Sequence, residues 1–173
     1  EPSGCTDTMV IGTEDQYRGW KLDGSIDLAR TSARKLTVTT TRGEFSASGL
    51  DSDRTFIRDS RRSVNITGLK SDELTIQTST GDISATAVST KKLDVTSGQG
   101  SVSLWLENPL SQNSSVWSAS GSVTVRLPSQ SQGRFIVESK KGSSQNEFSS
   151  SKSKTKFSVS SKTGDVSLKK SSQ

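Results

Sequence analysis

The sequence predicts an all-β, single-domain β-solenoid of about seven to eight coils, each 19–22 residues long. Three observations favour this class. A short motif of alternating apolar residues around a glycine recurs along nearly the whole chain. Only 28% of the 173 residues are hydrophobic, too few for the thick core of a compact sandwich. These few residues nevertheless keep a strict phase, which a disordered chain would not show.

The clearest copy of the motif is residues 74–85, LTIQTSTGDISA. Counted from Gly81 as position 0, apolar residues stand at positions −7, −5, +2 and +4, and Ser or Thr stands at −3. Alternation with a period of two is typical of a strand that buries one face. A glycine supplies the backbone freedom that a sharp turn between strands requires. Each copy therefore predicts two short strands joined at a corner.

The chain begins outside this pattern. Residues 1–16 do not fit it, and the apolar run 9–11 within them is either a first strand or a cap on one end of the stack. The solenoid is expected over residues 17–170, followed by a polar tail, 171–173. Successive corners fall at positions 43, 62, 81, 100, 121, 142 and 164, spaced by 19, 19, 19, 21, 21 and 22 residues. Six of them are glycines: Gly43, Gly81, Gly100, Gly121, Gly142 and Gly164.

Two copies depart from the pattern. Arg62 replaces the glycine of one corner, while Ile57 and Val64 keep the apolar phase. The copy at Gly142 has polar residues at its two outgoing apolar positions, and Phe148 is a candidate to fill that gap. The turn at residues 107–109 contains Pro109 and lengthens another coil, because proline cannot continue a paired central strand.

A solenoid needs a cap on each end of its core, and the C-terminal stretch is the candidate for the second cap. If coils stack in sequence order, the copy around Gly164 ends the stack, and the stretch 169–173 that follows it is too polar to cover a core. This leaves two alternatives, end-on self-association or a further C-terminal segment.

A β-sandwich is the alternative architecture, since it also has a strand every 8 to 12 residues. A sandwich has no reason to repeat one motif at one spacing. The recurrence therefore favours the solenoid.

Three segments, LTIQTSTGDISA, LDVTSGQGSVSL and FSVSSKTGDVSL, resemble the DUF4097 family, which carries the label of an adhesin. The core of its motif, Ser or Thr followed three residues later by Gly-Asp and an apolar residue, is complete at residues 78–83 and 161–166. The resemblance covers roughly residues 20–170. It implies a right-handed β-solenoid outside the bacterial cytoplasmic membrane, often attached to it, and a role in adhesion or in cell-envelope stress systems. It supplies no catalytic residues.

Composition argues against enzymatic chemistry. The chain has no histidine, and Cys5 alone can form neither an internal disulfide nor a zinc site. Asp82 and Asp165 follow corner glycines and would lie four coils, about 19 Å, apart, well beyond the range of paired catalytic carboxylates. Acidic corner residues are also too sparse for the calcium sites of repeat solenoids. We therefore expect a non-enzymatic protein without a cofactor.

Basic residues beside the corners would form a loose ridge along one edge of the stack. The net charge is only +5, with 23 basic and 18 acidic residues. The ridge could engage an anionic wall polymer or a membrane surface, or it could protect strand edges from aggregation. Nucleic acid is disfavoured because aromatic residues do not alternate with the charges. The ridge residues are Arg42, Arg61, Arg62, Lys140, Lys141 and Lys162.

Trp105 and Trp117 fall on outward positions on either side of Pro109. Exposed tryptophans stack on sugars or on partner proteins. Alternatively, both pack under the loop between Leu106 and Asn113, which would explain why that coil is longer.

The function expected from these observations is an extracytoplasmic surface module that acts through an unknown protein or a cell-surface glycan. No apolar run approaches 18 residues, so any membrane anchor would lie in a segment outside this sequence.

Overall fold

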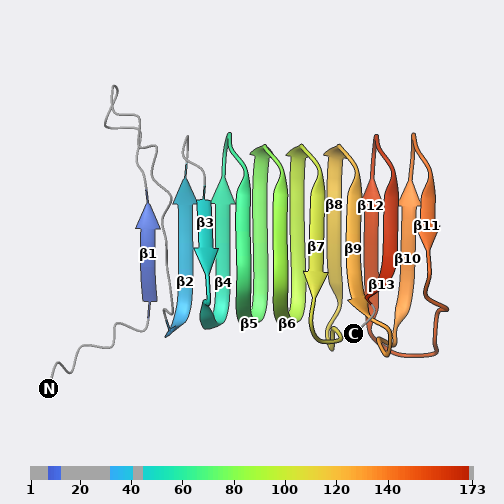
Figure 1. The fold of residues 1–173 in the computed structure, drawn as a ribbon, viewed down its shortest axis with the longest axis horizontal. Helices are drawn as coiled ribbons and strands as arrows, with labels where there is room; N and C mark the ends of the chain where they lie inside the picture. The colour runs from blue at the N-terminus through green and yellow to red at the C-terminus, as the bar shows by residue number, and fades with distance from the viewer. Residues whose placement is uncertain (1–7, 13–31, 41–44, 172–173) are drawn as a thin grey trace, which may run out of the picture.

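A computed structural model describes residues 8–12, 32–40 and 45–171 of the chain, and these form a single elongated stack of strands (Figure 1). Every strand pairs in parallel with its neighbours, which confirms the predicted β-solenoid. No helix occurs among the described residues, hence none of the length and apolar character needed to cross a membrane. The strands are β1 (Thr8–Gly12), β2 (Ser32–Thr40), β3 (Phe45–Ser48), β4 (Asp51–Asp59), β5 (Val64–Thr80), β6 (Ile83–Gln99), β7 (Val102–Leu106), β8 (Ser114–Ser120), β9 (Val123–Pro128), β10 (Arg134–Ser139), β11 (Ser144–Asn146), β12 (Lys156–Ser161) and β13 (Val166–Ser171).

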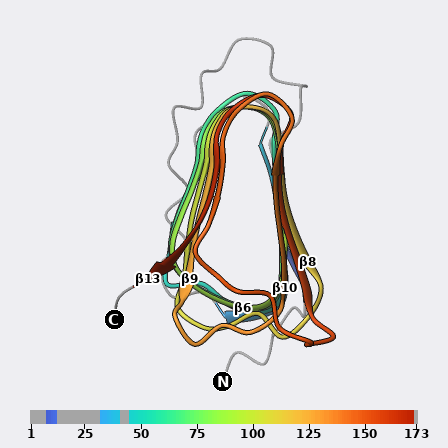
Figure 2. The same ribbon diagram turned by 90° about the vertical axis from the view of Figure 1, so that its right-hand side faces the viewer.

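Viewed along the stack, each coil is narrow at one end and broad at the other (Figure 2). The motif corners form the narrow end, called the apex here, and the opposite end is the base. Strands β2, β4, β8, β12 and β10 run towards the apex and form the ascending face (Figure 1). Strands β3, β7, β9, β13 and β11 run back and form the descending face. The long strands β5 and β6 bend at the base and contribute to both faces.

The core consists of columns of like side chains, one from each coil. Residues at position −5 are at most 1% exposed in six coils. Full burial of one such side chain stabilises the folded state by about 1.5–3 kcal/mol. Each coil needs only a few inward residues because the next coil covers them. This explains how a chain with so few hydrophobic residues folds. The column contains Val38, Ile57, Ile76, Val95, Val116 and Val159, and Val137 continues it, half-buried, at the end of the stack.

The coils do not follow sequence order at the C-terminal end of the stack. Strand β12 pairs with β8 on one side and β10 on the other, and β13 lies between β9 and β11. The last coil of the chain is therefore inserted between the two that precede it (Figure 1). The expectation of sequential stacking was wrong.

Hydrophobic content explains this insertion. Val166 and Leu168 are 1% and 0% exposed, so the coil of β12 and β13 needs a neighbour on each side. In the coil of β10 and β11, Ser144 and Asn146 occupy the corresponding positions and are exposed. A polar strand of this kind is stable only where one side faces water. The polar coil accordingly ends the stack.

The terminal coil closes the core with an aromatic pair. The rings of Phe135 and Phe148 lie 4.9 Å apart, and the Lys170 ammonium group lies 5.5 Å from the centre of the Phe148 ring. The Phe135 amide donates to the Ser150 hydroxyl at 3.3 Å. Phe148 thus fills the gap as predicted. Because β13 lies inside the stack, its polar end is no longer a reason to expect end-on association.

The base holds a second turn that the sequence motif did not reveal. Gly49, Gly68 and Ala87 occupy equivalent positions in three successive coils, with φ angles of 63°, 66° and 54°. The next coil omits this residue, so the register between β6 and β7 shifts between Ala85 and Val88. The signal was present in the sequence as SGL and TGL, 19 residues apart.

Ala87→Gly is expected to stabilise the protein by up to about 1 kcal/mol. A left-handed conformation costs an alanine roughly 1–2 kcal/mol, of which the greater unfolded-state entropy of glycine offsets part. Urea unfolding measures the change. Ala85→Gly is the matched control, because Ala85 is a buried strand residue without a positive φ and its replacement should destabilise. A stability loss in the Ala87 variant would contradict this account.

Candidate binding surfaces

At the apex, corner glycines allow the coils to approach closely. Gly81, Gly100, Gly121 and Gly164 have φ angles of 136°, 140°, 138° and 129°, which side chains rarely adopt. A Cβ atom on any of them would lie within 2.5 Å of a carbonyl oxygen of the neighbouring coil. Gly142 stacks on Gly164 without a left-handed φ, and Gly43 lies outside the described residues.

The hydroxyl groups at position −3 hold these corners together. The Ser118 hydroxyl donates to the Gly100 carbonyl at 3.1 Å, and the Ser161 hydroxyl donates to the Gly121 carbonyl at 2.9 Å. Ser139 makes the equivalent bond to Gly164 at 2.7 Å. These hydroxyls, two of them buried, donate hydrogen bonds to carbonyls of the closely packed corners. The motif requires Ser or Thr there for that reason.

At one corner, both the glycine and the Ser or Thr at position −3 are replaced by other residues. Asp59 takes the place of Ser or Thr in the copy whose corner is Arg62. Its Oδ1 accepts from the backbone amides of Arg61 and Arg62 at 3.0 and 3.4 Å. The residue is 1% exposed, and its Oδ2 has no hydrogen-bond partner within the described part of the chain. The carboxylate stabilises a corner without a left-handed residue. The coincidence of Asp at −3 with the missing glycine was a signal that the sequence reasoning missed.

Asp59→Ala should lower the free energy of unfolding by about 1–3 kcal/mol, because it leaves two amides without an acceptor. The double variant Asp59→Ser with Arg62→Gly restores the common corner and should recover most of this loss. Thermal unfolding of the two variants beside the parent chain measures both effects. A double variant as unstable as Asp59→Ala would show that the two positions do not compensate each other.

The basic residues at the apex form two clusters rather than one ridge. Arg61 and Arg62 lie towards one end of the stack, and Lys162 lies on the coil next to Lys140 and Lys141 at the other. Three corners without lysine or arginine separate the clusters, so they are about 19 Å apart. Arg42 lies outside the described residues.

A carboxylate adjoins the lysine cluster. Asp165 accepts from the Ser143 amide and the Ser143 hydroxyl, both at 2.8 Å, and these bonds lower the pKa of Asp165 below its ordinary value of 3.8. Stability linked to this group is present above that value and is lost as the pH falls through the lowered pKa. The insertion also changes a predicted separation, because Asp82 and Asp165 are three coils, about 14 Å, apart instead of four.

The two tryptophans point outward on opposite faces. Trp105 on the descending face is 45% exposed, and Trp117 on the ascending face is 40% exposed. Neither fills the loop at residues 107–113. Leu110 is buried there instead, and the Asn108 side chain bonds to both backbone groups of Thr90, at 3.0 and 3.4 Å. The exposed arrangement is therefore the one that the structure adopts.

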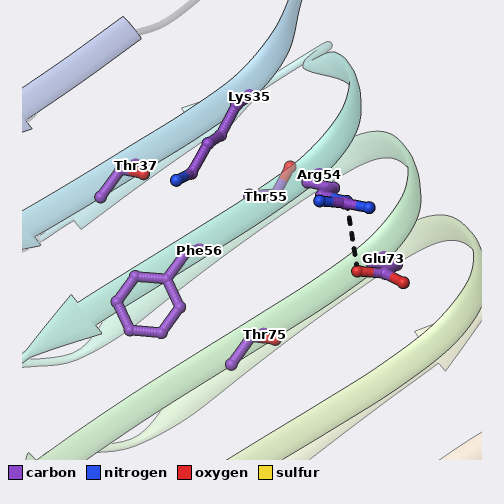
Figure 3. A pocket seen from close by; sticks show the side chains of 7 residues that line it. All are labelled: Lys35, Thr37, Arg54, Thr55, Phe56, Glu73 and Thr75. Atoms are coloured by element: carbon purple, nitrogen blue, oxygen red, sulfur yellow. Dashed lines mark ion pairs between the residues drawn. The ribbon is translucent and has the colours of Figure 1, made fainter. Parts of the chain in front are cut away.

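Each face also carries a shallow hollow. On the ascending face, Phe56 lies between two threonines beside an ion pair in which Arg54 Nε is 3.5 Å from Glu73 Oε2 (Figure 3). This hollow has a volume of about 380 Å³ and is lined by Lys35, Thr37, Arg54, Thr55, Phe56, Glu73 and Thr75. On the descending face, a hollow of about 310 Å³ is lined by Trp105, Arg126, Glu147, Lys169, Lys170 and Ser171.

Sequence reasoning found Trp105 but missed its neighbours. Trp105, Arg126 and Lys169 all occupy position +5 of their coils, and the strand register places them side by side. Their shared position in the motif was the signal in the sequence that could have identified the group. No cluster of three or more histidine, cysteine or acidic residues that could hold a metal ion occurs in the described ranges.

The model of the Toastrack DUF4097 family matches residues 20–170. No curated protein and no solved structure matches the chain significantly. The match covers the repeats from which the coils are built, in agreement with the parallel strand stack and its glycine corners. Membership suggests an interaction module and specifies neither its partner nor its location. The chain belongs to the Toastrack DUF4097 family, and its fold is a β-solenoid.

Proposed function

We propose that this protein is a non-enzymatic binding module that acts outside the cytoplasmic membrane, as an adhesin or a cell-envelope sensing scaffold. The observation that carries this proposal is the exposure of Trp105 and Trp117, 45% and 40%, beside the polar outward residues Ser103 and Ser115. Tryptophan is enriched among the residues that dominate binding energy in protein interfaces, and it also stacks on sugars. A protein or a cell-surface glycan is accordingly the partner.

The solenoid suits this role because its surface is independent of its core. Outward side chains of adjacent coils lie about 4.8 Å apart on strands that are hydrogen-bonded on both sides. They can change without disturbing the inward columns. The separation of Asp82 and Asp165, about 14 Å, supports a function other than acid–base catalysis by paired carboxylates.

Capture on immobilised protein tests the proposal. Envelope proteins and purified wall polymers are applied at low and physiological salt to the parent chain, to Trp105→Ala, to Trp117→Ala and to the double variant that carries both substitutions. We expect saturable capture of an identified component that persists at physiological salt and is lost in one tryptophan variant. Equal capture by the parent and by the double tryptophan variant would contradict the proposal.

A second candidate is the binding of anionic wall polymers or lipid headgroups by the apical lysines. The proximity of Lys162 to Lys140 and Lys141 on adjacent coils favours it. Binding to vesicles that contain anionic lipid should then weaken with salt and disappear in Lys140→Glu with Lys141→Glu. Binding that persists in this charge-reversed variant would exclude the lysine cluster.

A further inference from the structure

One outward row of the descending face changes its chemistry along the stack. Position +5 is Ser48, Thr67 and Thr86 in three successive coils, then Trp105, Arg126 and Lys169, and Glu147 in the terminal coil. The register pairs Trp105 with Arg126 and Arg126 with Lys169. Neighbouring members are therefore about 4.8 Å apart. Along the stack the row therefore presents hydroxyls, an aromatic ring, two cations and a terminal carboxylate, with a register shift between the hydroxyls and the ring.

The electrostatics of the hollow at the end of this row favour an anion. Arg126, Lys169 and Lys170 line it together with one carboxylate, Glu147. Glu147 Oε2 accepts from the Lys170 backbone amide at 2.8 Å, so part of its charge is committed within the protein. Arg126 is exposed, and its planar guanidinium group can bind a carboxylate or a phosphate through two parallel hydrogen bonds.

The aromatic and polar members of the row match the rest of a sugar chain. A half-exposed indole offers a face on which the apolar side of a sugar ring can stack. The exposed hydroxyl of Thr67 can exchange hydrogen bonds with sugar hydroxyls. A single-stranded nucleic acid would require successive aromatic platforms, whereas Trp105 is the one aromatic residue in this row.

We propose that the row Trp105–Arg126–Lys169 binds an anionic glycan, a polysaccharide bearing carboxylate or phosphate groups, which lies across the strands of the descending face. This inference rests on the proposed function and names the site and the ligand class. It also gives the inserted coil a role. In sequential order Arg126 would adjoin Glu147, and the insertion places Lys169 there instead.

A fluorescence titration tests this site directly. In the variant Trp20→Phe with Trp117→Phe, Trp105 is the only tryptophan and reports on its own hollow. The probes are oligogalacturonate and a poly(glycerol phosphate), which distinguish carboxylate from phosphate, and methyl-esterified oligogalacturonate as the uncharged match. We expect a saturable change in Trp105 emission with at least one of the charged probes and at least tenfold weaker binding of the ester.

Substitutions identify the residues responsible. Arg126→Ala and Lys169→Ala should each weaken binding of the charged probe about tenfold at low ionic strength, and less at high salt. Arg58→Ala is the control, because it removes the same charge from an exposed position on the opposite face. Circular dichroism and an unchanged unfolding midpoint verify that each variant folds.

The outcomes separate this inference from the proposed function. Equal binding of the ester, or no effect of Arg126→Ala and Lys169→Ala, overturns the anionic site. If neither charged probe alters Trp105 emission while Trp105→Ala abolishes capture of an envelope protein, the anionic glycan is wrong and the binding module stands. If capture is also independent of both tryptophans, the two proposals fall together.

Discussion

Gly100→Ala is expected to lower the free energy of unfolding by about 3 kcal/mol or more. The added Cβ atom would lie 2.2 Å from the carbonyl oxygen of Gly81 and 2.5 Å from its carbon. Gly100 also has a φ of 140°, where alanine is strained. The backbone cannot withdraw easily, because hydrogen bonds join this coil to a neighbour on each side. Equilibrium unfolding in urea measures the loss.

Gly68→Ala separates the contribution of the clash from that of backbone strain. Gly68 also has a positive φ, 66°, but a Cβ atom there would meet nothing closer than 3.6 Å. Its replacement should cost only about 1–2 kcal/mol, the ordinary penalty of a left-handed alanine. Equal losses in the two variants would mean that close stacking at the apex contributes nothing to the requirement for glycine.

Removing residues 156–173 is expected to unfold the coil of β10 and β11, although that coil precedes the deletion in the sequence. The deleted strands lie between it and the coil of β8 and β9. Burial of Phe157, Val159, Val166 and Leu168, at about 1.5–3 kcal/mol each, is lost as well. Hydrogen exchange of the truncated chain should show residues 134–146 unprotected and the coils before residue 128 still protected. Continued protection of residues 134–146 would instead indicate sequential stacking.

An engineered disulfide tests the same topology in the full chain. With Cys5 replaced by serine, Ser115→Cys and Ser158→Cys should form a bridge, because these residues face each other on paired strands. The control pair, Ser115→Cys with Ile136→Cys, spans two strand spacings, about 9.6 Å, beyond the reach of a disulfide. Bridging of the control pair and not of the first would contradict the inserted coil.

Much of the fold was predictable because the motif is local. Alternation around Gly81 specifies which residues point inward, and the structure buries Leu74, Ile76, Ile83 and Ala85 as predicted. The sequence also placed the tryptophans on outward positions. The separate turn at Gly68 was not predicted, because the equivalent position in the next copy is Ala87 and glycine therefore does not recur there as it does at the corners.

The sequence by itself determined the class of fold, the spacing of its coils and the identity of the inward columns, since these depend on periodicity within each copy. Tertiary structure alone decided the order of the last three coils. That order depends on which coil can leave one side exposed to water. Ser144 is polar enough to be exposed and Val166 is not, and this difference is apparent only when two copies of the motif are compared. The same choice brought Arg126 beside Lys169. The surface next to Trp105 therefore depends on how the coils stack, which is a property of the assembled solenoid.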